Sequence, residues 1–448
     1  MKLNLWHKSL LTSVAALSVV LAFYHNDYTI SNFQSASSVA DIQFQPESFH
    51  IRNGSGYSDS LFSPVAVTMQ KVMRREGLRG GVSIAISLNG SVVYARGIGF
   101  SSLEDSITLE PYNVMRVASV SKLITAVAIM HLVEEGRLML DQKVFGPIGV
   151  LNDDVYMTMR DRRMTEVTVR NLLDHSGGWN SKYGDPMFMP YVIAQETGAE
   201  LPVDIEDIIR FMQGKKMHFY PSSYSVYSNF GYGILGEVVA KVSGMPYEDY
   251  VRSQVLAPLG IFDAHLGHSH KENRLPFETA YYEPDTTSLV PDYAERGRLS
   301  RRAYGGADIH TLGSAGGWVI SSVDLLKLVL SIDGFASVPD QLSALSIAQM
   351  TDPNSRFDPL GWRKVIGGAW FRTGTLAATS AIVCRRPDGI CFATIFNSSS
   401  GLGPHLAILI ANQMNAAINS VIKSEKPWPK EDLLDTDETW QHYKLQGK

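Results

Sequence analysis

Cysteine is nearly absent from this chain, since only Cys384 and Cys391 occur among 448 residues. A scaffold held by many disulfides is therefore excluded. The two cysteines flank the segment 387–389, Pro-Asp-Gly, which is typical of a hairpin turn. A two-residue loop places the cysteines opposite each other and permits one disulfide, whereas a bulge at Gly389 turns them to opposite faces of the sheet. Both registers stay open.

The chain also lacks a strong charge imbalance. It carries 40 Lys and Arg residues against 45 Asp and Glu residues, a formal net charge of -5, and no basic stretch is interleaved with aromatic residues. Nucleic-acid binding normally needs such a positively charged surface. We therefore expect no nucleic-acid partner.

The N-terminal segment has its own composition. Residues 9–23, SLLTSVAALSVVLAF, carry no charge and follow Lys2 and Lys8. A basic start before a short apolar run is typical of a signal peptide, and the run is short for a membrane-spanning helix of about 20 residues. Residues 1–24 are thus expected to be a cleaved signal peptide or a retained membrane anchor. Both alternatives predict export, to the periplasm or the extracellular space.

The rest of the chain divides by composition into a linker or stalk (25–63), one folded domain (64–422) and a polar C-terminal tail (423–448). Alternating apolar residues around an Asn-Gly turn predict a hairpin early in the domain, and strand patterns return near its end. Helical patterns dominate between them. We therefore predict an α+β fold, with one antiparallel sheet built from N- and C-terminal segments and flanked by helices, and a large, mostly helical insertion.

One predicted helix carries a residue that is unusual for its position. The run 123–133 is apolar on nearly every side, as in a helix buried inside a domain, yet Ser119 and Lys122 stand at its start. A helix N-terminus and burial both disfavour a charged ammonium. Either Lys122 reaches solvent, or the site needs a lysine with a lowered pKa. Residues at i and i+3 share a helix face, so the amine can reach the Ser119 hydroxyl.

Two further short motifs follow in chain order: Tyr-Ser-Asn at 227–229 and Arg-Thr-Gly at 372–374. Each motif alone is weak, because similar triplets and a second Ser-x-x-Lys at 420–423 occur by chance. Taken in order after Ser-Val-Ser-Lys, the set resembles the serine β-lactamase and penicillin-binding-protein family. Tyr-x-Asn is similar to the class C branch and to its relatives, the D-aminopeptidases, DD-carboxypeptidases and family VIII esterases. The resemblance covers roughly residues 63–421.

The resemblance implies a β-lactamase/transpeptidase-like fold and a reaction. Ser119 would attack an ester, amide or D-amino-acid peptide carbonyl and form an acyl-enzyme, with Lys122 and Tyr227 sharing the proton transfer. Which of the two is the main base stays open. Substrate binding would fall to Asn229, Arg372, Thr373, Gly374 and Thr375, with the N–H groups of Ser119 and Thr375 as oxyanion donors. No cofactor and no metal are implied, and the partner is a small-molecule or peptide substrate.

Two departures from the family pattern bear on the substrate. Arg372 stands where relatives carry lysine or histidine, and arginine cannot lose its proton. It can bind a carboxylate bidentately, so one hypothesis is a substrate with an acidic group; the alternative is that Arg372 points aside. Ala377 and Ala378 replace a frequent Pro-Gly, which argues against a true β-lactamase. A β-lactamase or D-alanyl-D-alanine carboxypeptidase, and a catalytically silent binding module, are the alternative functions.

The histidines give weaker signals. His265, His268 and His270 lie close together, but no carboxylate has a matching spacing, so we predict no metal site there. His175, in the segment Asp-His-Ser-Gly-Gly-Trp, is interpreted as a structural histidine that holds a loop.

Overall fold

The computed structural model describes residues 60–275, 277–285 and 287–446. The predicted signal peptide or anchor, with its possible membrane segment at 9–24, and nearly all of the predicted linker lie outside the described residues. Leu61 and Phe62, at the end of that linker, are buried. The packed domain therefore begins slightly before residue 64. Within the described ranges, no helix is both long and apolar enough to cross a membrane.

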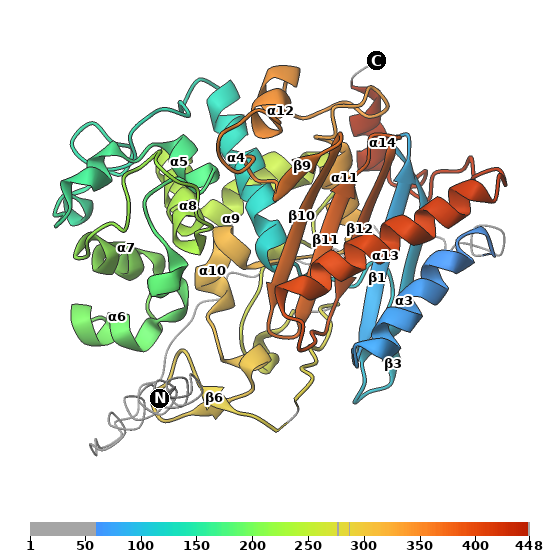
Figure 1. The fold of residues 1–448 in the computed structure, drawn as a ribbon, viewed down its shortest axis with the longest axis horizontal. Coiled ribbons are helices and arrows are strands. Elements are labelled where there is room, and N and C mark those ends of the chain that lie inside the picture. The colour runs from blue at the N-terminus through green and yellow to red at the C-terminus, as the bar shows by residue number, and fades with distance from the viewer. Residues whose placement is uncertain (1–59, 276, 286, 447–448) are drawn as a thin grey trace, which may run out of the picture. The chain divides into compact units, whose positions relative to one another are not determined.

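A seven-stranded antiparallel sheet lies beside the helical middle segment of the domain (Figure 1), in the order β3-β2-β1-β12-β11-β10-β9. The strands are β1 (Gly81–Leu88), β2 (Ser91–Ser102), β3 (Ile107–Thr108), β9 (Lys364–Ile366), β10 (Ala369–Leu376), β11 (Thr379–Arg385) and β12 (Ile390–Phe396). The first three come from the N-terminal part of the domain and the last four from its C-terminal part. They join where β1 pairs with β12. The predicted α+β class, with its sheet built from both ends of the domain, is confirmed.

The two predicted hairpin turns both form. Asn89 and Gly90 have φ values of 49° and 82°, the left-handed backbone that a tight two-residue hairpin needs. In the second hairpin, Cys391 pairs with Arg385 rather than with Cys384. This one-residue offset turns the cysteines to opposite faces of the sheet, and both are free. The bulged register is the correct one of the two that the sequence left open.

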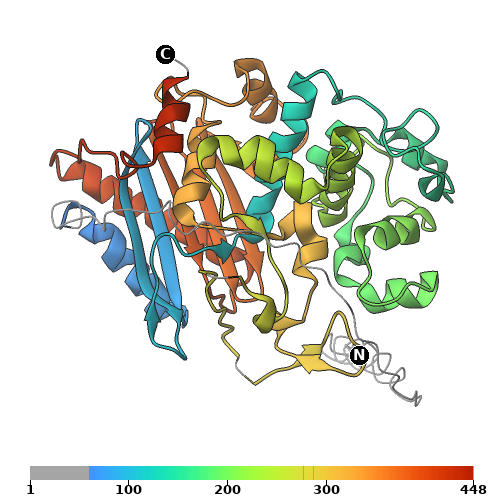
Figure 2. The same ribbon diagram turned by 180° about the vertical axis from the view of Figure 1, so that it is seen from behind.

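Helices cover both faces of the sheet. The helices α3 (Ser63–Arg75) and α13 (Pro404–Lys423) lie side by side across one face, and α11 (Ser322–Leu330) packs against the other (Figures 1 and 2). The remaining helices are α4 (Ser121–Glu134), α5 (Val169–Leu173), α6 (Pro190–Thr197), α7 (Ile205–Gln213), α8 (Asn229–Ser243), α9 (Tyr247–Tyr250), α10 (Ile309–Gly316), α12 (Ala344–Met350) and α14 (Glu438–Leu445). Most of these helices belong to the segment between β2 and β9, which agrees with the predicted helical insertion.

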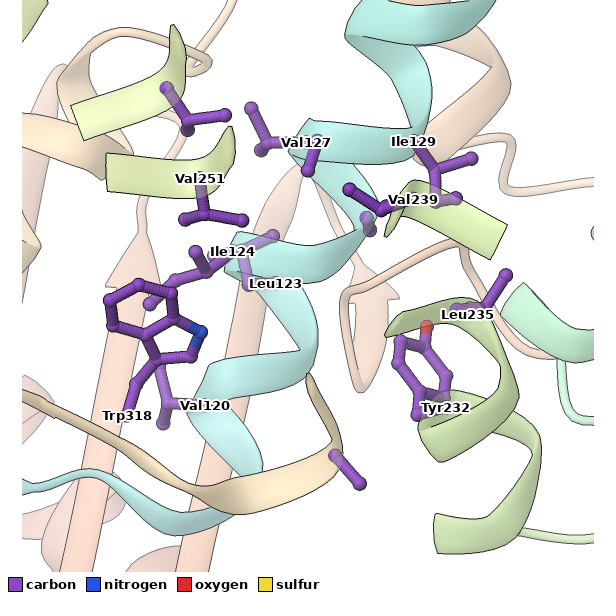
Figure 3. Close-up of a cluster of buried hydrophobic side chains, with 14 of the residues drawn as sticks. Val120, Leu123, Ile124, Val127, Ile129, Tyr232, Leu235, Val239, Val251 and Trp318 are labelled. Carbon is purple, nitrogen blue, oxygen red and sulfur yellow. The ribbon is translucent and has the colours of Figure 1, made fainter. Parts of the chain in front are cut away.

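Helix α4 is the buried helix that the sequence predicted. Its apolar side chains face neighbours on several sides, including Trp318 of the short strand β8 (Trp318–Ile320) and Leu235 and Val239 of α8 (Figure 3). All but a few of its residues are buried. The α-helix begins at Ser121 rather than at Ser119, because a 3-10 turn, Ala118–Val120, precedes it.

The C-terminal segment differs from the prediction of a polar tail. Residues 424–446 return to the domain, where Leu434 and Trp440 are fully buried in the main core. Asp432 accepts a hydrogen bond from the N–H of Val92 at 3.0 Å, and Lys327 of α11 donates to Asp437. The segment was predicted to be a polar tail because its many charged residues dominate its average composition, although a few apolar residues anchor it.

Replacing Trp440 with alanine should therefore lower the free energy of unfolding by about 3–5 kcal/mol, because it empties a large buried site. Urea unfolding of the Trp440→Ala protein measures this change. His442, on the same helix but exposed, supplies the control in His442→Ala. Equal unfolding midpoints for the two variants would show that the segment does not contribute to the core.

Candidate active site

Ser119 stands on a constrained turn. The preceding residue, Ala118, has a φ of 48°, a left-handed conformation that costs a non-glycine residue energy and persists only where its surroundings enforce it. The N–H of Val117 donates to the carbonyl oxygen of Trp318 at 3.0 Å, which ties the turn to strand β8. The half-buried Ser119 hydroxyl is thereby held at the start of the buried helix.

Lys122 points back along that helix to Ser119. Its Nζ lies 3.3 Å from Ser119 Oγ, 2.7 Å from Asn229 Oδ1 and 2.5 Å from the carbonyl oxygen of Ala315 in α10. The side chain is fully buried. The lysine therefore does not reach solvent, which decides between the two alternatives that the sequence offered.

Burial lowers the pKa of Lys122 from its ordinary value to about 8, with a further lowering by the charge of Arg372 and an opposing effect of Tyr227. The predicted lowering is confirmed. A neutral amine has two N–H groups and one lone pair. Because Asn229 Oδ1 and the Ala315 carbonyl oxygen can only accept, they take the two N–H groups. The lone pair is then left for the hydroxyl proton of Ser119.

Tyr227 approaches the same hydroxyl. Its Oη lies 2.6 Å from Ser119 Oγ, and Lys122 Nζ lies 4.9 Å from the centre of its ring. Burial by itself raises the pKa of Tyr227, but the charges of Lys122 and Arg372 outweigh burial and hold it below its ordinary value. Both candidate bases therefore lie within hydrogen-bond reach of one hydroxyl, and which of them is the main base stays open.

Asn229 begins α8 and connects Lys122 to a residue that the sequence analysis missed. Its Nδ2 donates to Asp185 Oδ2 at 2.7 Å. Asp185 lies in a loop and caps a 3-10 turn by accepting from the N–H of Met187 at 3.1 Å. No motif marks it, and its Asp-Pro context indicates only a turn. Only its contact with Asn229 in the folded structure identifies it.

Arg372 of β10 turns into the site rather than aside. Its Nε donates to the carbonyl oxygen of Ser119 at 2.8 Å, and its Nη2 lies 3.4 Å from Tyr227 Oη. Only 1% of the residue is exposed. The guanidinium therefore offers little surface to a substrate carboxylate, which argues against the hypothesis of an acidic substrate. Its charge instead acts on Lys122 and Tyr227.

Strand β10 passes directly beside the nucleophile. A Cβ atom added to Gly374 would lie 2.1 Å from the carbonyl oxygen of Val117 and 3.1 Å from the nitrogen of Ser119. Only glycine permits this approach. It brings the neighbouring residues Thr373 and Thr375, both half-buried, to the turn that carries Ser119. The pairing of the Ser119 and Thr375 N–H groups as oxyanion donors stays a prediction.

His175 supports the loop that carries Tyr227. Its Nδ1 accepts from the N–H of Ser228 at 3.2 Å, and its ring centre lies 4.7 Å from that of Tyr227. Burial and the charges of Arg372 and Lys122 hold the pKa of His175 well below its ordinary value, so the ring is neutral. These contacts agree with the interpretation of His175 as a structural histidine.

The three clustered histidines make separate contacts. His265 Nδ1 lies 2.8 Å from the carbonyl oxygen of Asp263, His270 Nε2 lies 2.9 Å from Asp292 Oδ2, and His268 stacks on His310. Among the residues that the structure describes, no group of three or more His, Cys, Asp or Glu side chains is arranged to hold a metal ion.

The chain is similar in sequence to known bacterial proteins. The chain is 24% identical to the putative penicillin-binding protein PbpX of Bacillus subtilis over 335 residues, which cover 74% of this chain and 71% of that protein. It is 25% identical to the protein flp of Staphylococcus aureus over 209 residues, which cover 45% of this chain and only 38% of that protein. The similarity to flp therefore concerns only part of that longer protein.

Solved structures share the fold. A D-amino acid amidase from Ochrobactrum anthropi SV3 matches with a TM-score of 0.63 at 20% identity, covering 82% of this chain and all of that one. EstCE1, a hydrolase with promiscuous acyltransferase activity, matches with a TM-score of 0.62 at 20% identity over 81% of this chain and 99% of its own. The β-lactamase family model matches residues 67–414. The chain therefore belongs to the β-lactamase family.

Proposed function

We propose that this protein is a serine hydrolase that acts through an acyl-enzyme on Ser119. The observation that carries the proposal is the arrangement around the Ser119 hydroxyl, which lies 2.6 Å from Tyr227 Oη and 3.3 Å from the buried amine of Lys122. A serine hydroxyl is a weak nucleophile until a neighbouring base takes its proton. Here two candidate bases meet one hydroxyl.

The reaction would proceed in two halves. Ser119 Oγ bonds to the substrate carbonyl carbon as its proton passes to Lys122 or Tyr227, and the N–H groups of Ser119 and Thr375 would stabilise the oxyanion. The carbonyl–heteroatom bond then breaks, and the leaving group takes up the proton. A water molecule attacks the acyl-enzyme by the same path, which releases the acid and restores the serine.

The substrate class we propose is a small ester, amide or D-amino-acid peptide. The fold likeness to a D-amino acid amidase and to the hydrolase EstCE1 supports it. The relatives named as penicillin-binding proteins favour the second candidate, a β-lactamase or D-alanyl-D-alanine carboxypeptidase. The assembled contacts among Ser119, Lys122, Tyr227 and Asn229 argue against a catalytically silent module.

A substrate panel tests this proposal. It contains short-chain p-nitrophenyl esters, the amides of D- and L-alanine, a D-alanyl-D-alanine peptide and a chromogenic cephalosporin, each assayed with the wild type and with Ser119→Ala. We expect turnover of an ester or D-amide that is lost in Ser119→Ala. Faster turnover of the cephalosporin or the peptide would favour the second candidate, and turnover that survives in Ser119→Ala would refute the role of Ser119.

The pH dependence of kcat/KM should follow the protonation state of the base. If the neutral form of Lys122 takes the proton, kcat/KM is lost as the amine becomes protonated below its pKa of about 8 and levels off above it. The measured midpoint belongs to the coupled pair of Lys122 and Tyr227. Rates for an ester, corrected at each pH for spontaneous hydrolysis, measure it. A kcat/KM that stays constant or falls on going from acid to pH 8 would contradict a lysine base.

A further inference from the structure

Asp185 lies behind the catalytic lysine as the end of a hydrogen-bonded chain. Asp185 Oδ2 accepts from Asn229 Nδ2 at 2.7 Å, and Asn229 Oδ1 accepts from Lys122 Nζ at 2.7 Å. We propose that Asp185 is a positioning residue that fixes the direction of the Asn229 amide and thereby aims the lone pair of Lys122 at Ser119. This inference rests on the function proposed above, because it assigns the lysine a role as base.

The two ends of an asparagine amide differ in hydrogen bonding, because the oxygen accepts and the NH2 group donates. An asparagine side chain fits its site in either of two orientations, with its oxygen and its NH2 group exchanged. Burial raises the pKa of the Asp185 carboxyl, whereas the hydrogen bonds from Asn229 and Met187 favour its ionised form. In that form the carboxylate can only accept hydrogen bonds, so Asp185 requires the NH2 group of Asn229. The amide oxygen then faces Lys122. In the reverse orientation, the NH2 group would donate to the lone pair of Lys122 and compete with the Ser119 hydroxyl for it.

The position of Asp185 is itself held in place. Its other carboxylate oxygen accepts from the N–H of Met187 at 3.1 Å, which fixes the carboxylate against the loop backbone. The residue is only partly exposed and lies beside a small hollow that Asn229, Trp179 and His218 also line. The protein therefore holds Asp185 in position without a bound substrate.

The charge of Asp185 gives the inference a second, independent consequence. The amine of Lys122 lies over the rings of Tyr227 and Tyr232 and interacts electrostatically with Arg372, His175 and Asp185. Of these five residues, Asp185 is the one with a carboxylate. A negative charge favours the protonated amine. Removing the charge should therefore lower the pH at which Lys122 becomes a base, whereas a purely structural role of Asp185 would leave that pH unchanged.

The test is the rate at which a fluorophosphonate labels Ser119, measured across acid, neutral and alkaline pH for the wild type, Asp185→Asn and Asp185→Ala. Asparagine has no charge and keeps only one of the two oxygens that accept from Asn229 and from the N–H of Met187, so we expect a midpoint at lower pH. Alanine removes the charge and the acceptor oxygens. We therefore expect a midpoint at lower pH together with a maximal rate reduced by about tenfold to a hundredfold.

A matched control is Asp204→Asn, which changes an aspartate that caps α7 by accepting from the N–H of Asp207. It should label as the wild type does. Wild-type midpoints in both Asp185 variants, or a wild-type maximal rate in Asp185→Ala, would overturn the inference. If Asp185→Ala does not fold, the midpoint of Asp185→Asn decides. Failure of the wild type itself to label would instead refute the proposed function.

Discussion

Replacing Lys122 with methionine is expected to lower kcat/KM by about 10²–10⁴-fold, the range that a positioned proton acceptor contributes. Methionine fills much of the buried space that the lysine stem occupies but has no group to take the Ser119 proton. It also leaves Asn229 Oδ1 and the carbonyl oxygen of Ala315 without their donor, so we expect a loss of about 1–3 kcal/mol in the free energy of unfolding. Steady-state kinetics and urea unfolding measure the two effects separately.

Two further variants show whether the loss is due to the base. Lys122→Arg restores a charged donor that cannot lose its proton, so it should remain as inactive as Lys122→Met. Lys241→Met removes a lysine that pairs with Asp153 on the surface and should keep wild-type kinetics. Activity of Lys122→Arg near the wild-type level would assign the proton transfer to Tyr227 alone.

Replacing Gly374 with alanine is the second change with a large expected effect. The added methyl group would lie 2.1 Å from the carbonyl oxygen of Val117, far inside van der Waals contact, and both sides of the contact are backbone. Either β10 or the turn that carries Ser119 must move. Displacement of a catalytic group by about 1 Å costs on the order of 100-fold in rate. We therefore expect kcat/KM to fall by about that factor.

Overpacking should also cost Gly374→Ala about 1–3 kcal/mol in the free energy of unfolding. The matched control is Gly401→Ala, because a Cβ atom at Gly401 meets nothing within 4 Å. Fluorophosphonate labelling and urea unfolding of both variants measure the difference. If Gly374→Ala labelled as fast as Gly401→Ala, the close approach of β10 would have no part in positioning Ser119.

The sequence predicted the site best where the chemistry is local. Ser119 and Lys122 are only three residues apart, at the start of one predicted helix, so their spacing alone indicates contact. Burial of that helix, visible as an apolar run, also predicted the direction of the lysine pKa shift. Tyr227 and Asn229 are far along the chain and were found only through their order after Ser119, which a family resemblance supplied.

Asp185 shows that a local sequence pattern cannot predict contacts between distant parts of the chain. Its partner Asn229 is 44 residues away, and the contact arises only when the loop and the start of α8 are brought together by the fold. Arg372 shows a related limit. Its type excluded proton transfer, but whether it faced a substrate or the backbone of Ser119 depended on how deeply β10 is buried.

The ends of the domain were predicted less well for a different physical reason. The C-terminal segment has mostly polar composition, and composition averages over the few residues that pack. Trp440 and Leu434 pack in the main core, and burial of one large side chain contributes several kcal/mol. The sequence left two registers open for the cysteine hairpin, because a bulge of a single residue changes the face of the sheet on which each side chain lies.

The most direct measurement is the intact mass of the protein after exposure to a fluorophosphonate, with Ser119→Ala treated in parallel. An activated serine at this position predicts one adduct on the wild type and none on Ser119→Ala. A parallel exposure to a penicillin separates the substrate classes, since a persistent penicilloyl adduct would favour the penicillin-binding alternative. A folded wild-type protein that gains no mass from either reagent would contradict catalysis at Ser119.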